Sequence, residues 1–268
     1  MRENVFDMVS ITRKDCRFMK HYTVYGKISH DKMNNTSTMP RAVILLSGGL
    51  DSATVAAIAK SEGHELFALT VDYGQRHRIE IEAAKKVAEH LGIAQHIIMP
   101  VDFRIFGGSS LTSEMEVPKD VPLEQIGQTI PNTYVPARNT VFLALALAYA
   151  ETVAAETIYI GISNVDYSGY PDCRPEFLQA FNLLANLATK AGVEKSPFVI
   201  EAPLISFTKR ETILRGLELG VDYSLTFTCY DPSPKGTRCG RCESCQLRRT
   251  AFHEAGVSDP TEQNKSIA

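Results

Sequence analysis

The fold of this chain is decided near its start, where an apolar run passes into a short glycine turn. The run and the turn read Ala42-Val43-Ile44-Leu45-Leu46-Ser47-Gly48-Gly49-Leu50-Asp51-Ser52. A helix-like stretch follows from Ala53 to Lys60. At such a junction the unpaired amides of the helix start favour a bound anion, and two glycines let the backbone approach it closely. The sequence therefore predicts a phosphate-binding loop between a strand and a helix.

The polar side chains of this loop favour a nucleotide. Ser47 and Ser52 offer hydroxyl donors, and Asp51 offers a carboxylate for the Mg²⁺ that accompanies a nucleotide. The loop lacks the Lys-Ser or Lys-Thr ending of the Walker pattern. The alternative is a plain turn, with Asp51 or Ser52 as a helix cap. We expect ATP to bind along Leu46, Ser47, Gly48, Gly49, Leu50, Asp51, Ser52, Ala53, Thr54, Val55 and Ala56.

Length and composition are those of an ordinary globular chain. With 268 residues, 44% of them hydrophobic, it can bury a substantial core in one or two domains. A net charge of −3 gives no global attraction to nucleic acid or to an anionic membrane. The longest apolar run, Val141 to Ala150, is shorter than the ~20 residues that cross a bilayer. We expect a cytoplasmic protein with no membrane partner and no nucleic-acid partner.

Strand and helix patterns alternate after residue 39. We expect strands at 42–46, 66–71, 95–99 and 157–162, with helices at 51–62, 78–91 and 139–155. This alternation predicts an α/β fold with a doubly wound, mainly parallel sheet. Residues 102–133 read as a long loop, and helical spacing returns at 175–191 and 209–219.

The domain boundaries follow from the same patterns. Residues 1–38 lack a sustained apolar period and are expected to be peripheral or disordered. We expect Met39 to be the natural start, an ATP-binding α/β domain at 39–225 and a metal-binding segment at 226–268.

Two further segments place polar and aromatic side chains at the carboxyl ends of expected strands. Asp72-Tyr73-Gly74-Gln75-Arg76-His77 follows the second strand, and Asp166-Tyr167-Ser168-Gly169-Tyr170-Pro171-Asp172-Cys173-Arg174 follows the fourth. Such side chains can stack on a ring, accept hydrogen bonds from a purine-like edge and pair a carboxylate. A polar turn explains the first segment equally well. We assign substrate binding to Tyr73, Gln75, Arg76, His77, Tyr170, Asp172 and Arg174.

Two cations complete the candidate site. Arg138 begins an apolar helix, where a guanidinium can bind phosphate oxygens bidentately, although Asn139 could simply cap that helix. Lys209 follows Thr208 and precedes Glu211, a pattern that also predicts an ordinary capped helix start. We take Asp51, Ser47, Arg138 and Lys209 as the catalytic candidates.

Four cysteines crowd into the end of the chain, at Cys229, Cys239, Cys242 and Cys245. In a reducing compartment such crowding indicates metal rather than disulfides. Four thiolates around one ion form a closed tetrahedral site with no position for a catalytic water. We expect one structural Zn²⁺, with an iron–sulfur cluster as the alternative.

Taken together, these motifs carry a resemblance to a known family. The loop at 47–52 resembles the signature of the N-type ATP pyrophosphatases, or PP-loop superfamily, whose fold is that of the adenine nucleotide alpha hydrolases. With the segments at 72–77, 135–139 and 168–174 and the four cysteines, the chain from about Met39 to Val257 resembles the 7-cyano-7-deazaguanine synthase family. Residues 1–38 have no counterpart there.

The resemblance implies an activity and a set of partners. It implies an ATP-dependent carbon–nitrogen ligase that converts 7-carboxy-7-deazaguanine and ammonia to the nitrile in queuosine biosynthesis, forming AMP and pyrophosphate. It also implies bound zinc and a homodimer. Two other functions stay open: a PP-loop transferase that delivers sulfur to RNA, to which Arg238, Arg241, Arg248 and Arg249 could bind, and a non-catalytic nucleotide- or zinc-binding module.

Overall fold

Five strands form one parallel sheet in the computed structural model, which describes residues 39–76, 78–163, 169–194 and 197–262. The strands lie side by side in the order β3-β2-β1-β4-β5, and each neighbouring pair is parallel. Their bounds are β1 (Arg41–Leu45), β2 (Glu65–Asp72), β3 (Gln95–Pro100), β4 (Thr157–Tyr159) and β5 (Val199–Glu201). The predicted parallel α/β sheet is confirmed.

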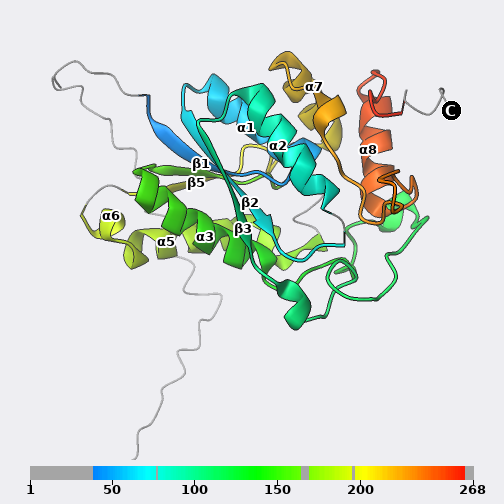
Figure 1. Ribbon diagram of the computed structural model, residues 1–268, viewed down its shortest axis with the longest axis horizontal. Helices are drawn as coiled ribbons and strands as arrows, with labels where there is room; N and C mark the ends of the chain where they lie inside the picture. The colour runs from blue at the N-terminus through cyan, green and yellow to red at the C-terminus, as the bar shows by residue number, and fades with distance from the viewer. Residues whose placement is uncertain (1–38, 77, 164–168, 195–196, 263–268) are drawn as a thin grey trace, which may run out of the picture. The chain divides into compact units, whose positions relative to one another are not determined.

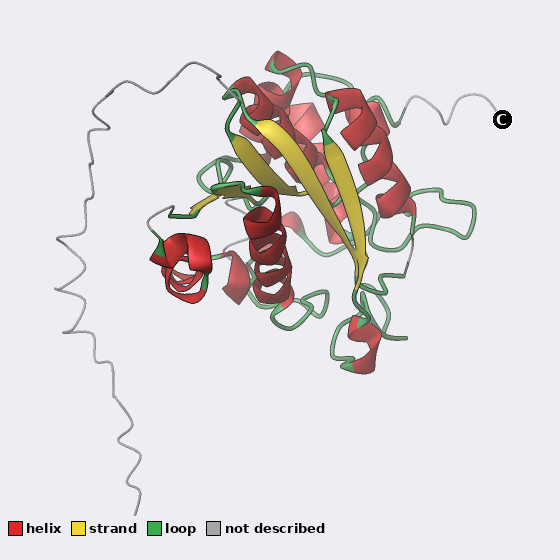
Figure 2. Ribbon diagram, turned by 60° about the vertical axis from the view of Figure 1, so that its left-hand side comes forward, coloured by secondary structure: helices red, strands yellow, loops and turns green. Residues whose placement is uncertain are grey.

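Helices cover both faces of this sheet (Figure 1). Helices α1, α2 and α7 pack on one face, and α3 and α5 pack on the other, as the turned view also shows (Figure 2). The sheet is therefore doubly wound, as predicted. The bounds are α1 (Leu50–Ser61), α2 (Ile79–Leu91), α3 (Arg138–Val153), α5 (Pro175–Ala188), α6 (Lys190–Val193), α7 (Lys209–Glu218) and α8 (Glu243–Glu254), with single 3-10 turns at Phe103–Ile105, Leu123–Gln125, Pro171–Cys173 and Tyr223–Leu225.

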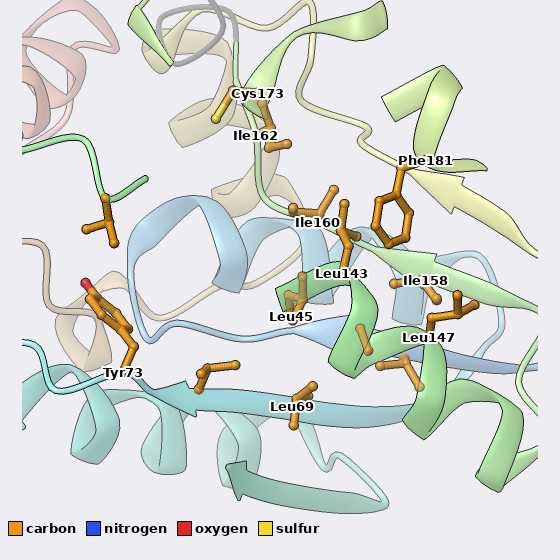
Figure 3. Close-up of a cluster of buried hydrophobic side chains, with 14 of the residues drawn as sticks. Leu45, Leu69, Tyr73, Leu143, Leu147, Ile158, Ile160, Ile162, Cys173 and Phe181 are labelled. Atoms are coloured by element: carbon orange, nitrogen blue, oxygen red, sulfur yellow. The ribbon is translucent and has the colours of Figure 1, made fainter. Parts of the chain in front are cut away.

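Strand β1 divides its side chains between two buried layers. Because successive side chains of a strand point to opposite faces, Val43 and Leu45 join the core under α3 and α5. Ala42 and Ile44 join the core under α1 and α2, as does Leu46 directly after the strand. Figure 3 shows the first layer, where Leu45, Leu69 and Ile158 from three strands meet Leu143 and Leu147 of α3. Burial on both faces explains why this strand reads as an unbroken apolar run.

The strand order fixes where a ligand can bind. The chain runs outward from β1 through β2 to β3, then returns to the other side of β1 with β4 and continues to β5. The order therefore reverses between β1 and β4. In open parallel sheets, ligands bind beyond the carboxyl ends of the strands at such a switch point. The glycine loop after β1 begins at this point.

The structure corrects several details of the sequence prediction. Strand β4 ends at Tyr159 rather than at 162, and Ile160 and Ile162 instead line the cavity described below. Strand β5 was missed because three residues are too short for a periodic signal. The predicted helix at 175–191 is two helices, α5 and α6.

The start of α3 also differs from the prediction. Asn139 does not cap this helix, because the capping position is Ala137, in the left-handed conformation with φ 52°. Asn139 instead donates its backbone N–H to Asp172 Oδ2 at 2.8 Å.

Some sequence predictions lie outside the described residues or remain predictions. The leader at 1–38, His77, Asp166 and Tyr167 fall outside the described ranges. The division into domains at 38 and 225 stays a prediction. None of the helices in the described ranges has both the length and the apolar character needed to cross a bilayer.

Candidate active site and metal centre

The loop between β1 and α1 has the geometry expected of a phosphate cradle. Gly48 adopts φ +83°, and a Cβ atom built on it would lie 2.2 Å from the Glu80 carbonyl oxygen and 2.6 Å from the Ala84 amide nitrogen. The loop therefore packs so tightly against α2 that only glycine fits. The hydrogen-bond ladder of α1 begins with Ala53 N–H donating to Gly49 O at 3.1 Å. Helix α1 thus supplies no carbonyl acceptor to the amides before Ala53, as an anion site requires.

The two loop serines hold the turn together. The hydroxyl oxygens of Ser47 and Ser52 lie 3.0 Å apart, and the Ser52 hydroxyl also lies within donating distance of Gly49 O, at 3.1 Å. The Gly49 N–H points to Ser47 Oγ at 3.3 Å. Of the predicted ATP-binding residues, Leu46, Ala53, Thr54, Val55 and Ala56 are buried behind the loop. Those five residues support the cradle from beneath rather than line the cavity in front of it.

Asp51 and Lys209 form an ion pair across the loop. Lys209 Nζ lies 2.8 Å from Asp51 Oδ2, and both side chains are largely shielded from solvent. Lys209 is the first residue of α7, whose start is fixed by a capping box between Thr208 and Glu211. The cap expected from the sequence is therefore present. It places an ammonium group beside the loop, so the two interpretations of Lys209 are compatible.

A cavity of about 210 Å³ opens in front of the loop. Its walls come from the loop, from the carboxyl ends of β2 and β4, from the start of α3 and from the segment before the cysteines. Lining residues include Ser47, Asp51, Tyr73, Glu80, Arg138, Tyr170, Phe227 and Thr228. Figure 3 shows Tyr73 at the end of β2 and Ile162 and Cys173 beyond the end of β4. The cavity thus joins segments that are more than 150 residues apart in the chain.

Aromatic rings surround the Arg138 guanidinium on one wall. Its carbon lies 5.8 Å from the centre of the Tyr73 ring and 5.9 Å from that of Phe142. Both distances suit cation–π contact, and the Tyr73 hydroxyl is also a hydrogen-bond partner of the guanidinium, which has five N–H donors in all. Burial raises the pKa of Tyr73 to about 12, so its hydroxyl stays neutral. Arg138 can therefore present its donors to an anion in the cavity.

Glu80 is a lining residue that the sequence analysis missed. It lies in the first turn of α2, three residues after the segment at 72–77. Burial raises the pKa of its carboxyl to about 7, although the charge of Arg138 acts in the opposite direction. A signal existed in the sequence, because an acid one turn beyond a rim segment faces the same edge of the sheet.

The structure places three other predicted substrate residues at two neighbouring pockets. Tyr170 lines the cavity, and its hydroxyl lies 3.1 Å from that of Thr133. Gln75 borders a small adjoining pocket, where its side-chain oxygen accepts the Tyr73 N–H at 2.9 Å. Arg76 borders the same pocket, and its guanidinium donates to Ser113 O at 3.0 Å. Tyr170 thus lies at the main cavity, whereas Gln75 and Arg76 line the small pocket beside it.

Asp172 and Arg174 lie elsewhere. The buried Asp172 carboxylate accepts the backbone N–H of Asn139 at the start of α3. Arg174 is exposed at the N-terminal cap of α5. Neither residue lines the cavity, and their roles in substrate binding stay predictions.

The four clustered cysteines form a site that fits a metal ion. The sulfur atoms of Cys229, Cys239, Cys242 and Cys245 all lie within 4.8 Å of one another, and three of the residues are buried. Backbone amides point at the sulfurs, including Cys239 N to Cys229 Sγ at 3.2 Å and Cys242 N to Cys239 Sγ at 3.3 Å. Hydrogen bonds from Cys229 and Cys245 lower the pKa of Cys242. Hydrogen bonds with Cys242 and Cys245 raise the pKa of Cys229, so the thiols share protons within the cluster, and the backbone amides aimed at the sulfurs favour the thiolate form that binds metal.

The arginines near this cluster are already paired within the chain. Arg248 is buried and donates to both carboxylate oxygens of Asp259, at 2.6 and 2.9 Å. Arg238 lies 3.6 Å from the same carboxylate. Arg241 pairs with Asp120, and Arg249 lies 3.7 Å from Glu262. These contacts neutralise much of the basic patch that the sequence suggested, and this weakens the case for RNA binding.

Comparison with known proteins gives one consistent result. The model of the family described as "Queuosine biosynthesis protein QueC" matches residues 41–256. The 7-cyano-7-deazaguanine synthase of Paramagnetospirillum magneticum is 58% identical over 224 residues, which cover 84% of this chain and 99% of that protein. The proteins of that name from Desulfatibacillum aliphaticivorans and Myxococcus xanthus are 56% and 55% identical, over 85% and 84% of this chain and 98% of each relative.

The match and the cavity cover the same part of the chain. The matched range begins in β1 and ends just beyond α8, so it includes the loop, the cavity and all four cysteines. The family resemblance seen in the sequence motifs is confirmed. This chain belongs to the queuosine biosynthesis protein QueC family.

Proposed function

We propose that this protein is an ATP-dependent ligase that converts 7-carboxy-7-deazaguanine and ammonia to 7-cyano-7-deazaguanine. The observation that carries the proposal is the loop at 47–52, which lies at the switch point of the sheet in a chain of this family. Its helix-start amides, Asp51 and Arg138 surround one cavity, and Lys209 is bonded to Asp51. That combination suits a triphosphate held beside a second substrate.

The first half-reaction activates the carboxylate. A carboxylate is a poor electrophile, so one of its oxygens attacks the α-phosphate of ATP and pyrophosphate leaves. The product is an acyl adenylate, whose AMP is a good leaving group. The loop amides and Lys209 would stabilise the charge on the phosphates, and Arg138 would orient the carboxylate or a phosphate oxygen. Mg²⁺ supplied with ATP would neutralise further phosphate charge, with Asp51 as its candidate ligand.

The second half-reaction forms the carbon–nitrogen bond. The nitrogen lone pair of ammonia attacks the acyl carbon, AMP leaves with the electron pair of the broken carbon–oxygen bond, the nitrogen loses one proton, and an amide results. The amide oxygen then attacks the α-phosphate of a second ATP. Loss of AMP and of the remaining nitrogen-bound protons leaves the nitrile. The same loop thus acts twice for each product.

The cysteine cluster takes no part in these steps. The four residues would hold one Zn²⁺ in a closed tetrahedral site that orders the end of the chain. We further propose that the enzyme is a cytoplasmic homodimer, as its family resemblance implies.

Mass analysis of the product tests this function directly. Incubation of the protein with ATP, ammonium and 7-carboxy-7-deazaguanine is expected to yield the nitrile, with two AMP and two pyrophosphate per nitrile. Accumulation of ADP, or ATP turnover that does not depend on the deazaguanine, would contradict the proposal.

A further inference from the structure

Two opposite charges, the Glu80 carboxylate and the Arg138 guanidinium, line the cavity and attract each other electrostatically. The Glu80 carboxylate is half-buried and makes no hydrogen bond or ion pair to another described residue. The Arg138 guanidinium is held by ring contacts with Tyr73 and Phe142, and the Tyr73 hydroxyl is also its hydrogen-bond partner. The remaining lining carboxylate, on Asp51, is bonded to Lys209. The Glu80 carboxylate keeps unused acceptor atoms and the five-donor Arg138 guanidinium keeps unused N–H groups, so the cavity can take one cation and one anion.

We propose that Glu80 binds the ammonium ion that the reaction consumes, an inference that rests on the proposed function. ATP and the carboxylated deazaguanine are anions and suit Arg138. Ammonium is a small cation with N–H donors, and it suits a carboxylate that has unused acceptor atoms. Mg²⁺ is the other cation of the reaction, but it arrives on the phosphates, on the side of the cavity where Asp51 lies.

The position of Glu80 agrees with this role. The first turn of α2 lies against the loop, since a Cβ atom on Gly48 would meet the Glu80 carbonyl oxygen. The acyl carbon must also lie at the loop, because its oxygen bonds the α-phosphate there. A nucleophile reacts from about 3–3.5 Å. A carboxylate rooted beside the loop can therefore hold the nitrogen near the carbon that it attacks, and it can accept the proton that ammonium loses to free its lone pair.

Helix stability does not account for Glu80. An acid in the first turn favours the helix dipole wherever it points, and Glu82 already supplies one on the exposed side of α2. The Glu80 side chain instead lines the cavity, close enough to Arg138 for the two charges to attract each other. The helix dipole therefore does not explain why the Glu80 side chain lines the cavity.

Glu80→Gln tests the role, because the amide keeps the shape and removes the charge. We expect the KM for ammonium to rise about 10- to 100-fold. Exchange of labelled pyrophosphate into ATP, which reports adenylation alone, is expected to stay within about twofold of the natural enzyme. Glu80→Asp, which keeps the charge, should give an intermediate KM. Glu89→Gln on the exposed side of the same helix is the matched control and should change neither quantity.

Hydroxylamine separates loss of the ammonium site from general damage. It is uncharged in mildly alkaline buffer, where ammonium is still a cation, and it converts an acyl adenylate to a hydroxamate. The Glu80→Gln variant should therefore form hydroxamate as well as the natural enzyme does. If Glu80→Gln lowered the rate equally with ammonium and with hydroxylamine, the proposal would be overturned. It would also be overturned if the variant raised only the Mg²⁺ concentration that the enzyme requires, or only the KM of the deazaguanine. Absence of pyrophosphate exchange in the natural enzyme would overturn the proposed function itself.

Discussion

The loop at 47–52 and the cysteine cluster at 229–245 are built from similar backbone contacts, but one site is open and the other is closed. Both arrange backbone amides around a space for a charged ligand. The loop opens onto a cavity of about 210 Å³ where a substrate can enter and leave. The four sulfurs close on one another within 4.8 Å and leave no position for a reactant. Access, rather than the kind of polar group, separates the region that reacts from the region that holds the structure together.

The largest expected effect is on the closed region. We expect Cys242→Ser, or removal of metal by a chelator, to disorder the segment from Cys229 to α8, because metal contributes about 10–16 kcal/mol in small thiolate sites. Metal analysis with limited proteolysis measures both changes. Cys173→Ser, which changes a cysteine outside the cluster, should keep one metal per chain. Full metal content in Cys242→Ser would show that the cluster is not the metal site.

A substitution in the open region should lower the activity and leave the metal bound. Asp51→Ala removes the partner of Lys209 and the candidate ligand for Mg²⁺, so we expect AMP formation to fall by about 10³-fold. Metal content should stay at one per chain, because the substitution lies outside the cluster. AMP release at the natural rate would remove Asp51 from its assigned role.

Substitution of two glycines should have a smaller effect, on the free energy of unfolding, and it distinguishes close packing from backbone strain. Gly48 and Gly63 both have positive φ, but a Cβ atom meets the backbone of α2 at Gly48 and nothing within 4 Å at Gly63. Gly63→Ala should therefore cost about 1 kcal/mol of unfolding free energy, and Gly48→Ala about 3 kcal/mol. Denaturant unfolding of the two variants compares these costs. Equal losses of unfolding free energy would mean that α2 shifts to accommodate the added methyl group at Gly48, and that the cradle is less rigid than the structure indicates.

The smallest effect concerns acid stability near the metal centre. Burial alone raises the pKa of Asp259, but hydrogen bonds from Arg248 and Thr261 outweigh it and hold the pKa below its ordinary value. A carboxyl with a lowered folded-state pKa stabilises the protein above its unfolded pKa, and this contribution is lost as the pH falls through the folded pKa. Unfolding midpoints measured from neutral to acidic pH should fall less in Asp259→Asn than in the natural protein. An identical slope would exclude this pair as a source of acid sensitivity.

The sequence predicted the elements whose signal is local and continuous. Val43 to Leu46 reads as a buried strand because both of its faces are covered, and the cysteine spacing indicates a metal because one short segment carries every ligand. The capping box at Thr208 was predictable for the same reason.

Features that depend on distant partners were not predictable. The pairing of Lys209 with Asp51 joins residues 158 positions apart. Asp172 bonds the start of α3 because two strand ends converge there, and Glu80 enters the cavity because α2 packs on Gly48. The strand β5 is too short to carry a pattern of its own.

The central claim is that the loop forms an adenylate on the substrate twice in succession. It is tested most directly with 7-carboxy-7-deazaguanine that carries heavy oxygen at both carboxylate positions. The account predicts that each of the two AMP molecules released per nitrile contains one heavy oxygen, because each substrate oxygen leaves on an α-phosphate. AMP without label, with the heavy oxygen recovered in pyrophosphate or water, would contradict it.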